Sequence, residues 1–293
     1  MPELPEVEIT ARRLDGALRG REIESALAPG INALRTFDPP LSALQGSEIA
    51  GVRRRGKHLI VDVDGPAGPL SLLIHLMSAG RLQLFDKLAG PRDRTSRLLV
   101  RVRAAEGEAG PSELRLREFG TKQAAWVKLL ATSALEEDEA LAKLGPEAWP
   151  DPGSATELRE LLDAPRPLHT LLRDQHVIAG IGRSWVDEIL WEARLSPFKR
   201  GADLDEGEAE VLREAIVGCL GGAIEHYEQT VQLPIPDKLP MPLKVHRHEG
   251  EPCPRCGQTL LAVHFEDYVI AYCPAEQTEG RALKDRRLSR LLR

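Results

Sequence analysis

The chain has 293 residues, of which 42% are hydrophobic and 29% charged, and its formal net charge is −6. This length and apolar content are sufficient for two compact domains and exclude a chain dominated by disorder. A negative total argues against a uniformly basic nucleic-acid-binding surface. Basic residues nevertheless cluster at 53–57 and 276–293, and a local basic face can bind a polyanion despite a negative total.

Membrane insertion and secretion are not indicated. No run approaches the roughly 20 apolar residues of a membrane span. The opening MPELPEVE has neither the basic nor the apolar region of a secretory signal. We therefore expect a soluble cytoplasmic protein without a membrane partner.

The first predicted element is a helix within residues 2–20. Pro5 suits a first helical turn, Val7, Leu14 and Leu18 can share one face, and Gly20 is a suitable stop. Residues 46–130 then change character. Short apolar stretches punctuated by glycine and proline predict the strands of an antiparallel sandwich.

The second half of the chain is predicted to be mainly helical. A link rich in proline and glycine occupies 144–154, and helical patterns follow it. The proline-rich stretch 233–243 ends them. We expect three domains, listed here by residue range: 1–132, 144–235 and 244–293.

The N-terminus carries the first candidate for chemistry. Removal of Met1 would leave Pro2 with a free secondary amine, which titrates near pH 8, roughly two units below lysine. Such an amine can attack a sugar C1′ and form a cationic iminium, while Glu3 or Glu6 acts as a general acid or orients the amine. Alternatively, proline at position 2 and acidic residues in a first helical turn are ordinary features.

Two further segments can contact phosphate. Lys57 follows Gly56 at the start of a predicted strand, where it can bind a phosphate or serve as a surface charge. Gly180 and Gly182 precede a predicted helix, so backbone N–H groups there can face an anion. The alternative for these glycines is close packing between helices.

The late cysteines indicate a metal site. Cys253 and Cys256 have knuckle spacing, and 16 residues separate Cys256 from Cys273. The expected fourth ligand, three residues after Cys273, is Glu276. Three thiolates with one carboxylate are unusual for structural zinc, and His246, His248 and His264 are other candidates. A hairpin that packs without metal is the alternative.

These pieces, in this order, resemble the formamidopyrimidine-DNA glycosylase/endonuclease VIII family across nearly the whole chain. The fold that the resemblance implies is α+β, with an N-terminal two-layer β-sandwich and flanking helices, a helix–two-turn–helix domain, and a C-terminal β-hairpin zinc ribbon. The resemblance rests on seven short segments: MPELPEVE, RGKHL, HLMSAGRL, REFG, LGPE, AGIGRSWVDEIL and the cysteine ribbon.

The resemblance also implies roles for individual residues. It implies Pro2 as nucleophile, Glu3 as general acid, Glu6 as its supporting carboxylate and Lys57 as a phosphate contact. Residues expected to contact DNA are Met77, Arg117, Phe119, Gly182, Arg183 and Tyr268. Arg117 and Phe119 match residues that fill the void left by an everted base. Met77 falls near an intercalating methionine, although the family usually has one residue between the leucine and that methionine.

Three departures from the family pattern lie in the C-terminal part of the chain that the resemblance implies holds DNA. Arg183 stands where an asparagine is usual, Tyr268 where the ribbon carries a phosphate-binding arginine, and Glu276 where the fourth cysteine is expected. Asp267 and Glu266, just upstream, would repel phosphate. We expect Arg183 to compensate electrostatically for the lost ribbon arginine.

The implied function is that of a bifunctional DNA glycosylase/AP lyase of base excision repair. It would excise a damaged, oxidised base through a Pro2 Schiff base and cut the strand by β- and δ-elimination. We expect a monomer that acts on double-stranded DNA with a damaged base or abasic site near the nucleoid, and one structural zinc ion. The alternatives are a non-catalytic binder of damaged or nicked DNA and a glycosylase for an unusual lesion. The damaged base itself is not identified.

Overall fold

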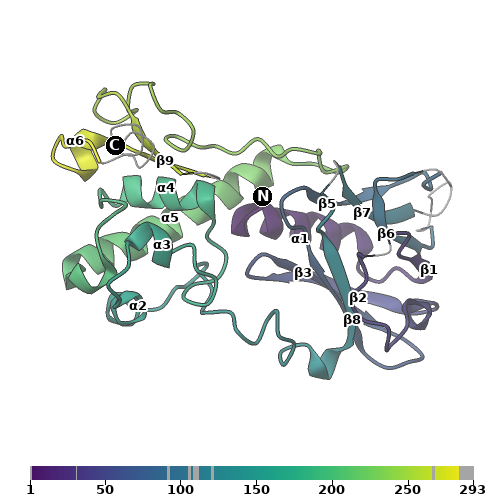
Figure 1. Cartoon of the computed structure of the whole chain (residues 1–293). Helices are drawn as coiled ribbons and strands as arrows, with labels where there is room; N and C mark the ends of the chain where they lie inside the picture. Colours follow the sequence, from purple (N-terminus) through teal and green to yellow (C-terminus); the bar gives the residue numbers. More distant parts are fainter. Residues whose placement is uncertain are drawn as a thin grey trace. The chain divides into compact units, whose positions relative to one another are not determined.

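The computed structural model forms two compact units. One comprises Met1–Lys143 and Tyr227–Pro240, and the other comprises Leu144–His226 and Met241–Arg293. The long helix α5 (Glu206–Thr230) therefore contributes residues to both (Figure 1). The residues that the structure describes are 2–30, 32–90, 93–104, 107, 112–119, 122–265 and 268–283. Most of the basic C-terminal tail predicted from the sequence lies outside them.

The first unit opens with the predicted helix, α1 (Leu4–Leu18). The Glu6 carboxylate accepts the backbone N–H of Glu3 at 2.8 Å, so one of the N–H groups at the helix start is satisfied by a side chain. Leu4, Val7 and Leu14 are fully buried, which confirms the predicted apolar face. Gly20 follows the helix with φ of +78°, a conformation that glycine adopts without steric cost.

Two antiparallel sheets of four strands follow, and they confirm the predicted β-sandwich. The first sheet has the order β1-β6-β7-β5, formed by Ile23–Leu27, Ser96–Val102, Ser112–Glu118 and Gly80–Phe85. The second has the order β2-β3-β4-β8, formed by Glu48–Arg55, His58–Asp64, Leu70–His75 and Trp126–Ala131. Two short 3₁₀ helices, η1 (Leu41–Leu44) and η2 (Thr132–Ala134), lie in the connections.

The end of α5 and the proline-rich stretch after it belong to this first unit. Arg13 of α1 donates to the carbonyl oxygens of Glu228 and Val231 at 2.6 and 2.8 Å, so its guanidinium caps the C-terminal end of α5. Gln83 of β5, which is buried, donates to the carbonyl of Ile235. The proline-rich segment is thus fastened to the sheet containing β5 and β7.

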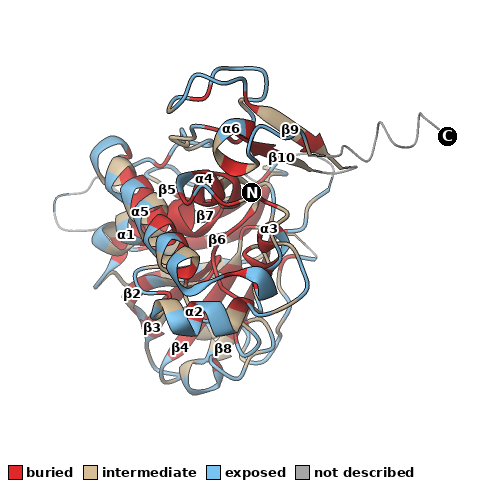
Figure 2. Cartoon of the chain, turned by 90° about the vertical axis from the view of Figure 1, so that its left-hand side faces the viewer, coloured by how far each residue is buried: buried red, intermediate tan, exposed pale blue. Residues whose placement is uncertain are grey.

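The second unit contains the remaining helices and a two-stranded hairpin. In chain order the helical elements are α2 (Ala155–Leu162), α3 (Leu168–Leu171), α4 (Arg183–Glu192), η3 (Gly201–Asp203), most of α5, and α6 (Pro274–Gln277). The hairpin pairs β9 (Leu261–His264) with β10 (Val269–Tyr272). Seven of the ten residues of α4 are buried, and the helix is drawn largely red in Figure 2, whereas much of α2 faces solvent.

Two adjacent carboxylates on α4 fix the ribbon segment to the helices. Glu188 accepts the backbone N–H groups of residues 244–246 at 2.8 to 2.9 Å. Asp187 accepts the backbone N–H of Ala271 on β10 at 3.0 Å and contacts Nδ1 of His246 at 2.7 Å. Burial raises the pKa of Glu188 although those N–H groups favour its ionised form. In the described part of the chain, no helix is long and apolar enough to span a membrane.

Candidate functional site

A buried hydrogen-bonded network stands at the start of α1, next to Pro2. Glu3 and Glu6 are 1% and 4% exposed. One oxygen of Glu6 accepts the Glu3 backbone N–H, and the other accepts the hydroxyl of Tyr227 at 2.8 Å. Burial and the negative charge of Glu6 raise the pKa of Tyr227, so the phenol remains a proton donor. Glu6 is therefore held at both oxygens, and it holds the backbone of Glu3 in turn.

Tyr227 is the member of this network that sequence reasoning did not single out. It lies 221 residues from Glu6 in the chain and is fully buried. It occurs near the end of a long amphipathic helix, where a tyrosine is unremarkable in the sequence. The one general expectation that applies is that the hydroxyl of a buried tyrosine finds a hydrogen-bond partner, and this does not identify Glu6 as that partner.

Lys57 lies in the turn between β2 and β3, beside a cluster of aromatic rings. It is 6% exposed, and the preceding Gly56 has φ of +55°. The rings of His58 and His75 are 4.7 Å apart, and His75 stacks on Trp126 at 5.7 Å. Burial lowers the pKa of His58 to about 4 and that of His75 to about 3, with the charge of Lys57 adding to the effect on His75. Both histidines are thus neutral near pH 7.

The residues expected to contact DNA in this unit lie at the ends of β4 and β7. Arg117 packs its guanidinium over Phe119 at 4.6 Å, and Phe119 is 41% exposed. The same guanidinium lies 3.4 Å from the carboxylate of Asp237 in the proline-rich segment. Met77 is half-buried with φ of +50°, a left-handed conformation that costs energy for any residue with a Cβ. The next residue, Ser78, is exposed.

In the second unit, Gly182 and Arg183 begin α4 as predicted. Gly182 is the N-cap and Arg183 the first helical residue. Gly180, two residues before, has φ of +107°, which only glycine adopts readily. The guanidinium of Arg183 lies over the ring of Tyr268 at 5.3 Å. The structure thus brings together two residues that the sequence analysis named separately.

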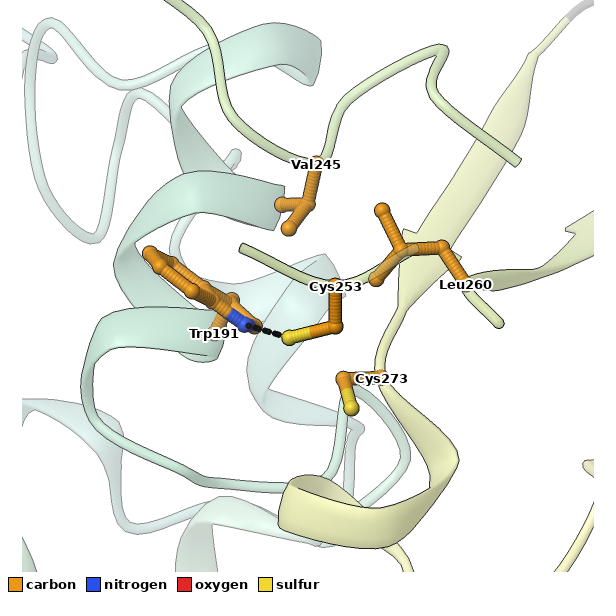
Figure 3. Packing of buried hydrophobic residues seen from close by; sticks show 5 residues of the cluster. All are labelled: Trp191, Val245, Cys253, Leu260 and Cys273. Atoms are coloured by element: carbon orange, nitrogen blue, oxygen red, sulfur yellow. Dashed lines mark hydrogen bonds between the residues drawn. The ribbon is translucent and has the colours of Figure 1, made fainter. Parts of the chain in front are cut away.

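Three thiols converge in the ribbon. The Sγ atoms of Cys253, Cys256 and Cys273 lie within 4.8 Å of one another. Zinc–sulfur bonds of about 2.3 Å in a tetrahedral site place sulfurs about 3.8 Å apart, so the set fits a zinc ion. Burial opposes ionisation of Cys253, but backbone N–H groups and Trp191 hydrogen-bond to its sulfur, and its pKa is lowered. Figure 3 shows the indole nitrogen of Trp191 directed at that sulfur.

Glu276, expected as the fourth ligand, is not part of this group. Its carboxylate lies 2.9 Å from the guanidinium of Arg255 and 3.8 Å from that of Arg194. The contact with Arg255 is an ion pair whose geometry is not that of a hydrogen bond. Arg255 also packs over Trp191 at 4.0 Å, so its charge is fixed beside the thiols and attracts the carboxylate. Of the alternative ligands, His246 contacts Asp187 and His248 contacts Glu251.

Comparison with known proteins assigns each of the two regions to a domain family. Residues 1–121 match the model of the formamidopyrimidine-DNA glycosylase N-terminal domain, and residues 144–234 match that of its H2TH domain. A formamidopyrimidine-DNA glycosylase from Streptococcus pyogenes serotype M28 is 30% identical over 281 residues, which cover 94% of this chain and 98% of the relative.

Solved structures give the same result. A complex of Lactococcus lactis Fpg with DNA containing an abasic site superimposes with a TM-score of 0.80 at 26% identity, covering 94% of this chain and 99% of that one. The wild-type L. lactis enzyme with DNA containing N7-benzyl-Fapy-dG gives 0.81 at 27% identity, covering 94% and 100%. This chain belongs to the formamidopyrimidine-DNA glycosylase family.

Proposed function

We propose that this protein is a bifunctional DNA glycosylase/AP lyase that removes an oxidised base from double-stranded DNA. The observation that carries the proposal is the buried network of Glu3, Glu6 and Tyr227 beside Pro2. A fold gains little from burying two carboxylates at one helix start, because their desolvation is costly. A catalytic role explains the arrangement, because the proposed reaction needs a proton donor and an oriented amine.

The reaction begins at the amine of Pro2 once Met1 has been removed. Its lone pair attacks C1′, the C1′–N bond to the base breaks, and the base leaves with the bonding electrons. The base takes up the proton that the proline nitrogen loses, which restores the lone pair on that nitrogen. Glu3 protonates the sugar ring oxygen, the ring opens, and a cationic iminium joins Pro2 to C1′. Loss of a C2′ proton then expels the 3′ phosphate, and a second elimination expels the 5′ phosphate. Water finally releases Pro2 from the sugar fragment.

The remaining residues are assigned to binding. Lys57 is proposed to contact a phosphate beside the lesion, with Gly182 and Arg183 contacting the backbone further along. Arg117 and Phe119 would fill the space left by the everted nucleotide, and Met77 would enter the base stack. The L. lactis complexes with DNA containing an abasic site or N7-benzyl-Fapy-dG support damaged DNA as the substrate class.

Zinc is proposed as a structural ion in the ribbon. Cys253, Cys256 and Cys273 would hold it as thiolates, and the ion would cross-link the two knuckles without entering the reaction. Glu276 would complete the set only by leaving Arg255. The contacts of the ribbon with α4 give it a second means of attachment.

The test is sodium borohydride trapping on a duplex that contains an abasic site. Borohydride reduces the iminium to a stable amine, so the parent protein should form a covalent adduct after mass spectrometry confirms that Met1 is absent. Pro2→Gly should lose most of the adduct and Glu3→Gln should slow its formation. Pro5→Ala, in the same helical turn, is the matched control and should trap normally.

A second candidate is a non-catalytic binder of damaged or nicked DNA. Tyr268 in place of the ribbon arginine, and the acidic residues before it, favour a changed mode of DNA binding. Protein that lacks Met1 and binds the abasic duplex, yet forms no adduct, would establish this candidate instead. Trapping only on a bulky or single-stranded lesion would indicate a glycosylase for an unusual substrate.

A further inference from the structure

The ring of Tyr268 contacts two arginine side chains from a different part of the second unit. The guanidinium of Arg173 lies over this ring at 4.6 Å and that of Arg183 at 5.3 Å. Phe265 stacks on the same ring at 4.4 Å with an interplanar angle of 4°. The ring of His169 is also nearly parallel to it, at 6.1 Å. The ring of Tyr268 thus contacts two cationic side chains as well as two other rings.

The loop that carries Arg173 is fixed by Gln175. The side-chain amide of Gln175 donates to the carbonyls of Arg173 and Ile181 at 2.9 and 2.8 Å, and its oxygen accepts the N–H of Gly180 at 3.0 Å. The two arginines are therefore carried by one cross-braced turn that ends at the start of α4. Their spacing does not depend on long flexible segments.

The guanidinium of Arg173 contacts an aromatic ring rather than an acidic side chain in the described structure. No carboxylate among residues 2–265 and 268–283 that the structure describes forms an ion pair with it. The adjacent Asp174 is occupied by Arg166 at 3.0 Å and by His176 at 3.6 Å. Burial lowers the pKa of His169, which stacks near Tyr268, and the charge of Arg173 adds to that effect. An anion beside the ring would be attracted by both guanidiniums.

We propose that Arg173 and Arg183, organised by Tyr268, form a two-guanidinium site for a phosphate of the DNA backbone. The inference rests on the proposed function in that it takes DNA as the anion. Guanidinium groups bind phosphate through paired hydrogen bonds, and a pre-positioned pair loses little side-chain entropy on binding. Arg173 supplies a cation from the helical region, and the ribbon contributes the aromatic ring that positions it.

The test measures binding to a duplex containing a tetrahydrofuran abasic-site analogue over a salt series. Arg173→Ala should weaken binding about tenfold, the loss of one charge-assisted contact. It should also make the slope of log affinity against log salt concentration shallower by about one, which corresponds to one fewer counterion released. The rate of borohydride trapping at saturating DNA is measured alongside, so that a change in chemistry is separated from a change in affinity. Arg166→Ala, a nearby arginine paired with Asp174, is the matched control and should leave affinity and salt dependence unchanged.

A double-mutant cycle tests the role of the ring. Tyr268→Ala should weaken binding, Tyr268→Phe should not, and the losses for Arg173→Ala and Tyr268→Ala should be less than additive. Equal affinity of Arg173→Ala and Arg166→Ala at every salt concentration would overturn the inference while parent binding and trapping kept the proposed function intact. Failure of the parent to bind the duplex would overturn both. Circular dichroism melting of each variant separates loss of contact from loss of fold.

Discussion

Replacing Tyr227 by phenylalanine removes one oxygen atom from the network at the start of α1. The lost hydrogen bond is 2.8 Å long and joins a fully buried phenol to a carboxylate that is 4% exposed. A hydrogen bond to a charged group contributes about 1.5 to 3 kcal/mol, and water has little access to replace it here. We therefore expect Tyr227→Phe to lower the free energy of unfolding of the unit containing α1 by that amount.

The same substitution should slow the chemistry. Glu6 would keep its contact with the Glu3 backbone through one oxygen only, so the general acid and the amine would be less well oriented. A loss of about 1.4 kcal/mol in the transition state corresponds to about tenfold in rate. Borohydride trapping under single-turnover conditions, with saturating abasic duplex, measures this rate directly.

The control for this prediction is Tyr272→Phe. Tyr272 is another buried tyrosine, and its hydroxyl accepts the backbone N–H of Leu283 in the ribbon unit. Its loss should lower stability without changing the trapping rate. The reasoning fails if Tyr227→Phe traps as fast as the parent, or if both variants slow trapping equally, since the phenol would then not act through Glu6.

Three further outcomes are expected. Asp237→Asn removes the negative charge 3.4 Å from Arg117 and should tighten duplex binding by no more than about fivefold, because the carboxylate is largely exposed. Unchanged or weaker binding, compared with the same substitution at Asp163 in the second unit, would contradict this. The lowered pKa values of His58 and His75 mean that the unfolded chain binds more protons between pH 6.5 and about 4, so stability should fall as pH falls through that window, by up to about 1.4 kcal/mol per pH unit for each histidine. Denaturant unfolding at several pH values should show this loss, and His58→Gln should reduce it. Glu276→Gln should retain one zinc per chain by elemental analysis, whereas Cys256→Ser should lose it; loss of zinc from the glutamine variant would make the carboxylate a ligand.

Local patterns in the sequence were sufficient for most of the fold. The apolar spacing of α1 and the short apolar strands between residues 46 and 130 each depend on neighbours within a few residues. The prediction of antiparallel sheets was therefore confirmed. The proline-rich segment was different, since its attachment to Gln83 and Arg117 is decided by residues more than 100 positions away. Proline indicated where the helix ends but not where the chain goes next.

In the candidate site, too, some contacts could be predicted from neighbouring residues in the sequence and others could not. Pro2, Glu3 and Glu6 lie close together in the chain at the start of α1, so the sequence alone could predict that they are neighbours. The contact from Tyr227 closes a span of 221 residues, and no local pattern indicates it. Arg173 escaped notice for a related reason, because an arginine between a short helix and a glycine turn is common. Only the position of the Tyr268 ring shows why that arginine matters.

The two departures from the family pattern in the ribbon, Tyr268 and Glu276, can be explained as parts of one structural change. An arginine on the hairpin can reach a phosphate only if the hairpin holds its own shape, which a complete zinc site ensures. Here the residue at the fourth-ligand position is a carboxylate that pairs with Arg255, and contacts with Asp187, Glu188 and Trp191 of α4 also hold the ribbon. A hairpin attached in this way is well suited to present a rigid ring, while the cations come from the cross-braced turn before α4. We therefore expect Tyr268→Arg, which restores the family residue, to weaken DNA binding in this chain, because it would place a third positive charge beside Arg173 and Arg183 and remove the surface that holds them. Tighter binding by that variant, measured on the same abasic duplex, would show that the ribbon still accepts the arginine and that the two substitutions are independent.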